Sequence, residues 1–427
     1  MKMLSRLLAP LFVWGAIASS LTGCVVNPVT GKSQISLMSP EQEVATGAKN
    51  YVPAQQAQGG QYVVDPGLTT YVQQVGKKLA VVSDRPDLPY EFVVLNNDIP
   101  NAWAMPGGKL AINRGLLVYL EDEAQLAAVM GHEIVHAAAR HGAQQQTQSV
   151  LMGAGVLIAG VAIAEKKPEY GALGMGALAV GSQAWQAKYG RDQELESDAV
   201  GMKYMIKAGY DPQAAVELQE IFVKLSEGKN AGFIEGLFAS HPPSQERVNK
   251  NRALAAKNPG GVRNKAAFQR AMAQVSKDKK AYENYQKAQK LAGEKKYIDA
   301  MTYVEQSIAH QPKENLFWEM KGQLLLQQDK TNEAVTAFNR AVDANPKYFK
   351  PYIFRGIAYN QLGKQDMAEK DLLTSTRYLP TQIAAYYLGE VNMAKGNRSQ
   401  AAQYYQQAAQ GGGEIGEAAK GKLGKLQ

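Results

Sequence analysis

The feature that most constrains the fold is a pattern of small and large residues that recurs every 34 positions in the C-terminal third of the chain. In its two clearest copies, Trp318, Gly322, Ala334, Phe338, Ala341 and Pro346 recur as Tyr352, Gly356, Ala368, Leu372, Ser375 and Pro380. Weaker copies stand one period before and one period after. Small residues let the two helices of a hairpin approach closely, and large ones fill the gap to the next hairpin. The pattern therefore predicts a stack of helical hairpins.

This pattern resembles the tetratricopeptide repeat, with about four copies over residues 281–415 and a C-terminal tail over residues 416–427. Arrays of this kind present a concave binding surface. We therefore expect the repeats to dock a client protein or an assembly machine. Residues 258–280, which begin with the turn signal NPGG and are otherwise polar and basic, are predicted to form a linker or a connecting helix.

Length and charge limit what else the chain can be. It has 427 residues, 45% of them apolar, which is enough for two or three domains. Its net charge of +8 is scattered, without a long basic tract. Because phosphate binding needs clustered positive charge, we expect no nucleic-acid partner.

Residues 1–23 have the pattern of a secretory signal. Lys2 and Arg6 give a positive start, and the apolar stretch from Leu7 to Ala18 is too short to span a bilayer. The end of the segment, LTGC, resembles a bacterial lipobox. That resemblance implies cleavage before Cys24 and lipidation of Cys24, which would anchor the protein in a membrane. The alternative is an ordinary signal peptide with an incidental cysteine.

Cys24 is the only cysteine, so no disulfide can form within the chain. The next residue is Val25 and not aspartate. By resemblance to sorted bacterial lipoproteins, this implies the outer membrane of a Gram-negative bacterium, with the mature chain on the periplasmic side. Residues 24–38 are then predicted to form a tether.

Residues 39–257 combine helix and strand signals and are predicted to form one domain. The sequence SPEQ at residues 39–42 is typical of a helix start, and we expect that helix to end near Tyr51. Residues 90–95 are β-rich and predict a strand, and residues 101–113 predict two more, joined by a Pro-Gly-Gly turn. From residue 121 to 142 the spacing of apolar residues is helical.

The motif HEIVH, from His132 to His136, lies in that helical stretch. Residues four apart share one face of a helix, so both histidines can bind one metal ion. Glu133 stands one step round the helix, where it can reach a water on that ion. Zinc lowers the pKa of such a water to roughly 7, so a carboxylate can take its proton. The alternative is a helix that only happens to carry two histidines.

The segment ELESD offers a third ligand. Glu194 and Asp198 are four residues apart and share a helix face. One carboxylate can bind the metal, while the other accepts the free ring N–H of a ligand histidine. Glu196 points away from that face and is predicted to be solvated. Taken alone, two acidic residues on a helix more often form a wet surface.

Together these motifs resemble a known family. HEIVH, the ExExD arrangement, Asp211-Pro212 and Ser240-His241-Pro242 look like the gluzincin metalloproteases that include HtpX and the CAAX prenyl proteases. NPVTGK after the lipobox and NAWAMPGGKL before the active helix resemble its bacterial lipoprotein members, among which are periplasmic proteases with tetratricopeptide repeats that act in outer-membrane protein assembly.

The resemblance implies an α+β metalloprotease domain, mostly helical with a small sheet, followed by an all-α tetratricopeptide solenoid. It implies one zinc ion held by His132, His136 and Glu194, with Glu133 as general base. It also implies that Asp198 orients a ligand.

His241 has three possible roles. It could be a fourth zinc ligand that acts as a latch, a donor to the tetrahedral oxyanion, or a loop histidine fixed by the two prolines that follow it. Arg247 is a weaker candidate for contact with the oxyanion or with Asp198. His141 follows His136 by five residues, which on a continuous helix places it off the ligand face. We therefore expect it to be structural or exposed.

Asn101, Ala102, Trp103 and Ala104 are candidates for substrate binding. If they form an edge strand beside the zinc, their backbone groups can pair with an extended substrate. The alternative is an ordinary sheet strand. Two apolar stretches at residues 150–164 and 171–185 are each too short to span a bilayer, and are predicted to form a helical hairpin on the protease, a membrane-dipping segment or a lid.

The favoured hypothesis is an outer-membrane lipoprotein zinc endopeptidase that degrades misassembled envelope proteins, including unfolded outer-membrane proteins. Its repeats would dock a client or the outer-membrane assembly machinery. The competing hypothesis is a periplasmic chaperone or scaffold in which the metal site is only regulatory or latent. The presence of every residue that the chemistry requires favours the protease.

Overall fold

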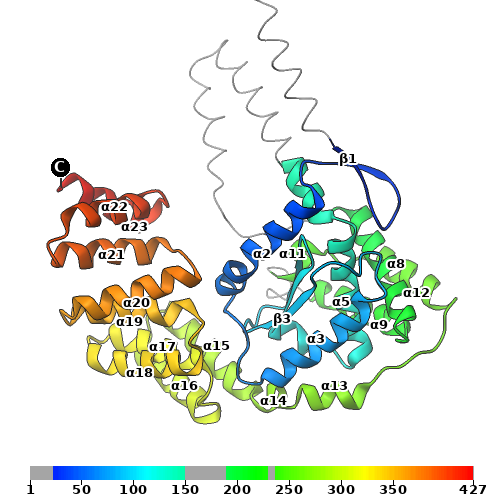
Figure 1. Cartoon of the computed structure of the whole chain (residues 1–427). Coiled ribbons are helices and arrows are strands. Elements are labelled where there is room, and N and C mark those ends of the chain that lie inside the picture. The colour runs from blue at the N-terminus through cyan, green and yellow to red at the C-terminus, as the bar shows by residue number, and fades with distance from the viewer. Residues whose placement is uncertain (1–22, 150–188, 229–235, 427) are drawn as a thin grey trace, which may run out of the picture. The chain divides into compact units, whose positions relative to one another are not determined.

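The computed structural model describes residues 23–149, 189–228 and 236–426 (Figure 1). It divides into two compact units. The first contains residues up to 54 together with 69–94 and 98–270, and the second contains residues 55–68, 95–97 and 271–427. The predicted signal segment and the apolar stretches at 150–164 and 171–185 lie outside the described residues. No helix in the described ranges is long and apolar enough to cross a membrane.

The first described element of the first unit is a small antiparallel hairpin. Strand β1 (Gly23–Val26) pairs with β2 (Ser33–Ser36), with Cys24 opposite Ile35. The connecting turn is closed by the side chain of Asn27, whose Oδ1 accepts hydrogen bonds from the backbone N–H groups of Val29 at 2.8 Å and Thr30 at 3.2 Å. The segment that the sequence predicts as a tether thus has secondary structure of its own.

Helix α2 (Pro40–Ala57) begins where the sequence predicts and continues beyond the predicted end. Ser39 Oγ accepts a hydrogen bond from Gln42 N at 3.2 Å, and Gln42 Oε1 accepts one from Ser39 N at 2.8 Å, which is a complete capping box. The helix continues through Pro53 because Gln55 and Gln56 are buried, so tertiary packing outweighs the local break. Helix α3 (Pro66–Ala80) follows.

A three-stranded sheet, in the order β3-β5-β4, lies beside these helices. Its strands are β3 (Glu91–Leu95), β4 (Ala102–Met105) and β5 (Lys109–Asn113). β4 and β5 are antiparallel, with Trp103 opposite Ala111. Gly107 and Gly108, both at positive φ, make the tight turn between them. All three strands stand within a residue or two of their predicted positions.

The helices that follow carry the candidate site. They are α4 (Arg114–Leu117), α5 (Glu123–Ala138), α8 (Arg191–Lys207), α9 (Gln213–Glu227), α11 (Leu237–Ser240) and α12 (Gln245–Ala255). α5 packs against α8, α9 and β4 and forms the centre of the unit, with Leu126, Ile134 and Val135 fully buried (Figure 1). α5 is shorter than predicted, because it stops at Ala138 and a second helical segment covers residues 141–149.

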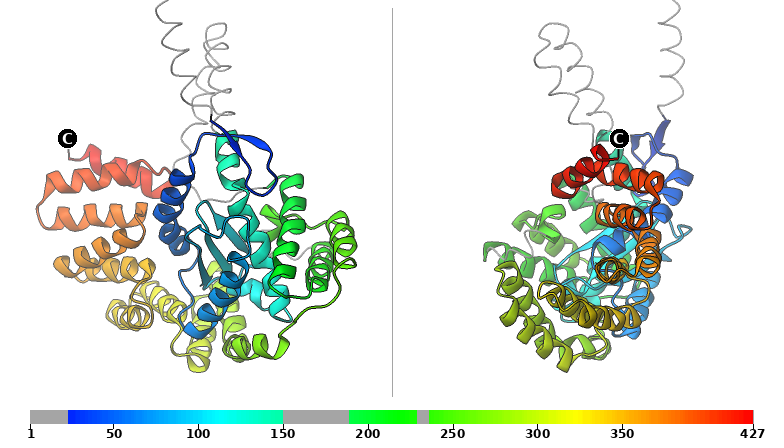
Figure 2. Two further views of the ribbon diagram at one scale, coloured as in Figure 1. Left: turned by 45° about the vertical axis from the view of Figure 1, so that its right-hand side comes forward. Right: turned by 90° about the vertical axis from the view of Figure 1, so that its left-hand side faces the viewer.

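The second unit contains the predicted stack of hairpins (Figure 2). α13 (Lys265–Ala271), in the first unit except for its last residue, and α14 (Ala273–Lys277) occupy the segment predicted as a linker or connecting helix. The hairpins are α15 (Lys279–Gly293) with α16 (Tyr297–His310), α17 (Asn315–Leu326) with α18 (Thr331–Ala344), α19 (Phe349–Gln361) with α20 (Gln365–Tyr378), and α21 (Gln382–Ala394) with α22 (Arg398–Ala409). A last helix, α23 (Gly413–Gly424), includes most of the predicted tail. It packs on α22 and buries Ala419 fully.

The repeat packs for the reason that its pattern suggests. A Cβ added at Gly322 would lie 2.4 Å from the ring of Phe338, and one added at Gly356 would lie 2.8 Å from Leu372. A Cβ at Gly389 would likewise lie 2.5 Å from Tyr405. Each glycine on a first helix therefore makes room for the large residue of the second helix.

Candidate metal centre

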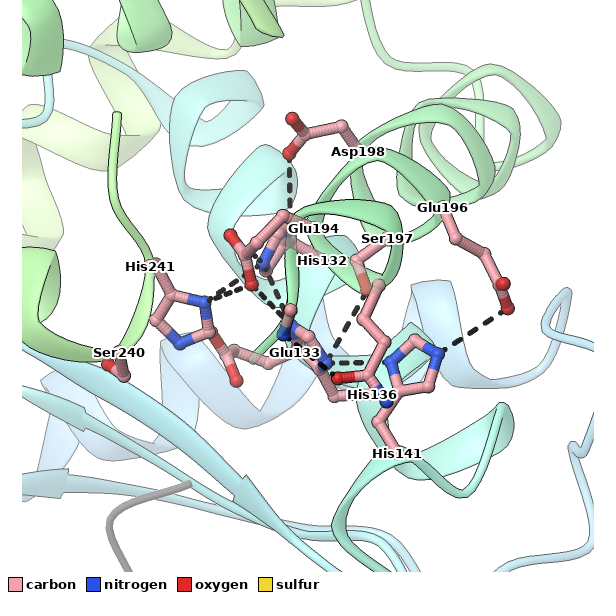
Figure 3. Close-up of polar contacts among 12 residues, drawn as sticks. His132, Glu133, His136, His141, Glu194, Glu196, Ser197, Asp198, Ser240 and His241 are labelled. Atoms are coloured by element: carbon pink, nitrogen blue, oxygen red, sulfur yellow. Dashed lines mark hydrogen bonds and ion pairs between the residues drawn. The ribbon is translucent and has the colours of Figure 1, made fainter. Parts of the chain in front are cut away.

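Two helices bring the candidate ligands together. α5 carries His132, Glu133 and His136, and α8 carries Glu194 and Asp198 (Figure 3). Gly201 on α8 faces Gly131 on α5, and a Cβ added at Gly201 would lie 2.9 Å from the backbone nitrogen of His132. The two helices can therefore approach closely enough for side chains from both to meet at one point.

Four donor atoms converge at this point. His132 Nε2 lies 3.0 Å from His136 Nε2 and 3.2 Å from His241 Nδ1. Glu194 Oε1 lies 3.4 Å from His136 Nε2 and 2.9 Å from His241 Nδ1. A tetrahedral zinc ion with bonds of about 2.0–2.1 Å needs its donors about 3.3 Å apart. The spacing and the chemistry of this cluster therefore fit a zinc ion.

The cluster is buried. The exposed fractions of His136, Glu194 and His241 are 1%, 2% and 4%, and that of His132 is 9%. Glu133 is also buried, and its Oε2 has no hydrogen-bond partner within the described part of the chain, while its Oε1 lies 3.4 Å from His241 Nε2. A buried carboxylate oxygen without a donor is costly unless a bound species uses it.

Burial and charge act in opposite directions on the titration of this site. Burial disfavours the charged form of His132, but the carboxylates of Glu194 and Asp198 outweigh it and raise its pKa to about 10. Burial raises the pKa of Glu133 and lowers that of His136 well below its usual value. For Glu194, the opposing effect of burial is overcome by His241 and His132, which hold its pKa well below the usual range.

Asp198 and Arg247 support His132 from behind. Asp198 Oδ1 accepts a hydrogen bond from His132 Nδ1 at 2.9 Å, which leaves His132 Nε2 to face the other donors. Arg247, on α12, binds Asp198 through Nε at 2.6 Å and Nη2 at 2.7 Å, and its Nη1 lies 2.8 Å from Glu194. The structure therefore shows the predicted contact of Arg247 with Asp198.

His136 has neighbours that sequence reasoning missed. The ring of Tyr189 stacks on its ring, with 3.6 Å between the centroids, and Ser197 Oγ lies 3.5 Å from its Nδ1. His141 Nδ1 lies 2.9 Å from the same atom. Glu196, predicted to be solvated, is only 22% exposed and reaches His141. No spacing rule predicts these contacts, because Tyr189 and Ser197 are far from His136 in sequence and the contact of His141 depends on the end of α5 at Ala138.

The predicted substrate strand and a cavity flank the cluster. Among the described strands, β4 pairs only with β5, so it is an edge of the sheet, and it packs on α5. The cavity beside His132 and Glu133 is lined by apolar side chains, among them Val129, Met202, Met205, Leu218, Phe222 and Leu237. The site thus has the outer strand of the described sheet on one side and an apolar recess on another.

Two family models match the chain. Residues 66–255 match Peptidase family M48, and residues 285–349 match the Tetratricopeptide repeat. The predicted resemblance to gluzincin metalloproteases is confirmed, as is a mostly helical α+β protease domain followed by helical repeats. This family implies zinc as the metal.

This chain is similar to several known proteases over part of their length. The Beta-barrel assembly-enhancing protease of Yersinia pestis is 28% identical over 264 residues, which are 59% of this chain and 53% of that protein. Its namesake in Escherichia coli (strain K12) is 29% identical over 232 residues, 53% of this chain and 47% of that protein. The Mitochondrial metalloendopeptidase OMA1 of Schizosaccharomyces pombe is 32% identical over 183 residues, 43% of this chain and 51% of that protein. The chain thus spans about half the length of these relatives.

Proposed function

We propose that this chain, whose residues 66–255 match Peptidase family M48, is a zinc endopeptidase that cleaves misassembled outer-membrane proteins. The observation that carries the proposal is the convergence of His132, His136 and Glu194 at zinc spacing. Beside them lies Glu133 Oε2, which has no hydrogen-bond partner among the described residues. One zinc ion held by these three residues would act as a Lewis acid on water and on the peptide carbonyl.

Glu133 is the general base of the proposed reaction. Its carboxylate takes a proton from the attacking water, whose oxygen then bonds to the carbonyl carbon of the peptide. The same proton passes to the amine as the C–N bond breaks. Burial raises the pKa of Glu133, so its carboxylate is a stronger base than one in water.

His241 is proposed to be a latch. Its Nδ1 lies within 3.2 Å of donor atoms of both His132 and Glu194, so it occupies a fourth corner of the cluster. A substrate carbonyl needs that corner. His241 must then leave before cleavage, which makes the resting enzyme latent. If His241 instead donates to the oxyanion, its loss would abolish activity.

The substrates, partners and location are proposed from the relatives and from the chain's motifs. The names of two relatives point to β-barrel assembly, and unassembled β-barrel proteins offer extended segments that could pair with the edge of β4, from Asn101 to Ala104. The repeats would dock the client or the assembly machinery. Lipidation of Cys24 would hold the protein on the periplasmic side of the outer membrane.

Zinc content and cleavage of casein or an unfolded outer-membrane protein test this function. We expect wild type to bind about one zinc ion, and Glu133→Gln to keep the metal and lose about 10²- to 10⁴-fold in cleavage rate. Asp192→Asn, at a side chain that is 98% exposed on α8, serves as the control and should match wild type.

His241→Ala separates the two roles of that residue. Higher cleavage than wild type supports the latch, and lost cleavage with retained zinc supports the oxyanion role. If wild type neither binds zinc nor cleaves either protein, the proposed protease is wrong and the scaffold hypothesis takes its place.

A further inference from the structure

A chain of polar contacts leads away from the metal cluster to the N-terminal hairpin, and Figure 3 shows its part from His136 through His141 to Glu196. His136 Nδ1 lies 2.9 Å from His141 Nδ1, and His141 Nε2 lies 3.5 Å from Glu196 Oε1. The same Glu196 oxygen accepts a hydrogen bond from Asn27 Nδ2 at 3.2 Å. Four side chains therefore connect a candidate zinc ligand to the turn of the NPVTGK motif, a motif without a role in the proposed reaction.

The position of His141 depends on the backbone conformation of Arg140, which is costly for a residue other than glycine. α5 ends at Ala138, and Arg140 has a φ of 64°, in the left-handed region that non-glycine residues seldom adopt. Its buried guanidinium bonds to Glu43 of α2 through Nε, and to the carbonyl of Met38 at 2.6 Å through Nη2. These contacts hold the turn that brings His141 back to His136, where a continuous helix would carry it away.

The proton positions along the chain are consistent from end to end. His136 Nε2 faces the other metal donors, so its Nδ1 carries the ring proton when Nε2 binds a metal. With that tautomer His136 donates to His141 Nδ1, and the ring proton of His141 is then on Nε2, which lies 3.5 Å from a carboxylate oxygen of Glu196. Asn27 supplies a second donor to that carboxylate. Every group thus meets a partner of the opposite kind.

We propose that His141, Glu196 and Asn27 form a relay that positions His136, and that the hairpin turn thereby helps to set the geometry of the metal site. His141 is a positioning residue, because it acts only through His136. The hairpin becomes part of the support of the metal site, where the sequence alone predicts a tether. This inference rests on the proposed zinc site.

Cobalt(II) titration of the full-length protein tests the relay, because the visible spectrum of cobalt reports ligand geometry independently of cleavage. Removing a partner that orients a ligand histidine costs about 10- to 100-fold in metal affinity. We expect a loss in that range for His141→Leu, with a changed spectrum. His141→Asn keeps an acceptor at the position of Nδ1, so it should recover most of the affinity and the wild-type spectrum.

The turn is tested with Asn27→Ala. Introduced into the wild type, Asn27→Ala should lower the cobalt affinity several-fold. Introduced into the His141→Leu variant, it should lower the affinity no further, because the relay is already broken there. Thr30→Ala, in the same turn but exposed, is the matched control and should bind cobalt like wild type.

Several outcomes would overturn the relay. Equal affinities and spectra for His141→Asn and His141→Leu would show that the acceptor atom does not matter. An equal loss from Asn27→Ala in both backgrounds would show that the turn acts independently of His141. A larger loss for Ser197→Ala than for His141→Leu would assign the role to Ser197, which lies 3.5 Å from His136 Nδ1. If His141→Leu does not fold, Asn27→Ala against Thr30→Ala still decides, because equal cobalt affinities for these two variants would contradict a role of Asn27. Failure of wild type to bind cobalt or zinc would instead contradict the proposed function.

Discussion

At the scale of single residues, His132 couples metal binding to pH. Burial opposes its charge, but the carboxylates of Glu194 and Asp198 raise its pKa to about 10, so at neutral pH a proton competes with a metal ion for its ring. Raising the pH removes this competitor.

We therefore expect zinc affinity to rise by up to about tenfold per pH unit from pH 6.5 towards 10, as competition with a chelator of known affinity would measure. In the Asp198→Asn variant, the pKa of His132 falls because one carboxylate is lost, so the rise should level off at lower pH. An affinity that is flat between pH 6.5 and 8.5 in wild type would contradict this account.

The buried pair of Asp198 and Arg247 gives a second prediction at this scale. Replacing Asp198 by asparagine leaves Arg247 with Glu194 as its remaining carboxylate partner, because the amide offers only one acceptor oxygen where the carboxylate offered two. It also exchanges the charged acceptor that orients His132 for a weaker, neutral one. We expect a loss of about 3–5 kcal/mol in unfolding free energy and about 10- to 100-fold in zinc affinity.

The matched control is the Arg191–Glu246 pair, which has the same two-bond geometry on the surface. Chemical denaturation of Glu246→Gln should show no measurable change, since exposed pairs contribute little. Equal losses for the two variants would show that burial is not what makes Asp198 important.

Spacing along a helix explains how much of the site could be predicted residue by residue. His132 with His136, and Glu194 with Asp198, are four apart within the uninterrupted helices α5 and α8, so the members of each pair share one helix face. His141 could not be placed this way. Its contact with His136 depends on the left-handed turn at Arg140, which is held by Glu43, a residue 97 positions away.

At the scale of elements, the site depends on how closely α5 and α8 approach. A methyl group at Gly201 would lie 2.9 Å from the backbone nitrogen of His132 and 3.0 Å from the carbonyl carbon of Gly131, and neither atom can move without its helix. We expect Gly201→Ala to lower the unfolding free energy by about 1–2 kcal/mol, since overpacking outweighs the gain in helix propensity. Zinc affinity should fall with it.

Gly293→Ala provides the comparison, because a Cβ at this helical glycine meets nothing within 4 Å. It should leave thermal denaturation and metal binding unchanged or slightly raise stability. If both variants behaved alike, the close contact of α5 and α8 would not be what assembles the site.

Elements were predictable where local signals agree with packing. The Pro-Gly-Gly turn locates β4 and β5, and the capping box of Ser39 locates the start of α2. The end of α2 was not predictable, because Pro53 signals a break that the burial of Gln55 and Gln56 overrides. The end of α5 was missed because alanines at 137–139 continue the helical pattern.

At the scale of the whole molecule, a period of 34 residues suffices to predict the helical stack, since each hairpin repeats the same packing problem. The pattern carries no information on segments that lack the period. Residues 55–68 and 95–97 belong to the same compact unit as the repeats, although they are distant in sequence. Contacts of that kind arise only in three dimensions.

The lipid anchor is a prediction at this scale. We expect the wild-type protein in the outer-membrane fraction of cells, and Cys24→Ser in the soluble periplasmic fraction, because the acyl chains supply the membrane affinity. Val25→Asp should move the protein to the inner membrane while leaving it lipidated, which mass spectrometry of the N-terminal peptide would check. Membrane retention of Cys24→Ser would contradict lipidation as the anchor.

The hairpin that contains Cys24 affects how a membrane-anchored enzyme of this kind would encounter its substrates. A flexible linker of 15 residues would let the protease domain move up to about 50 Å from its anchor. The pairing of Cys24 with Ile35 shortens that reach. A lipidated Cys24 would therefore hold the protease domain close to the bilayer, and the enzyme would meet its clients by lateral diffusion in two dimensions. Substrate proteins that diffuse freely in the periplasm would not be cleaved until they reached the membrane surface.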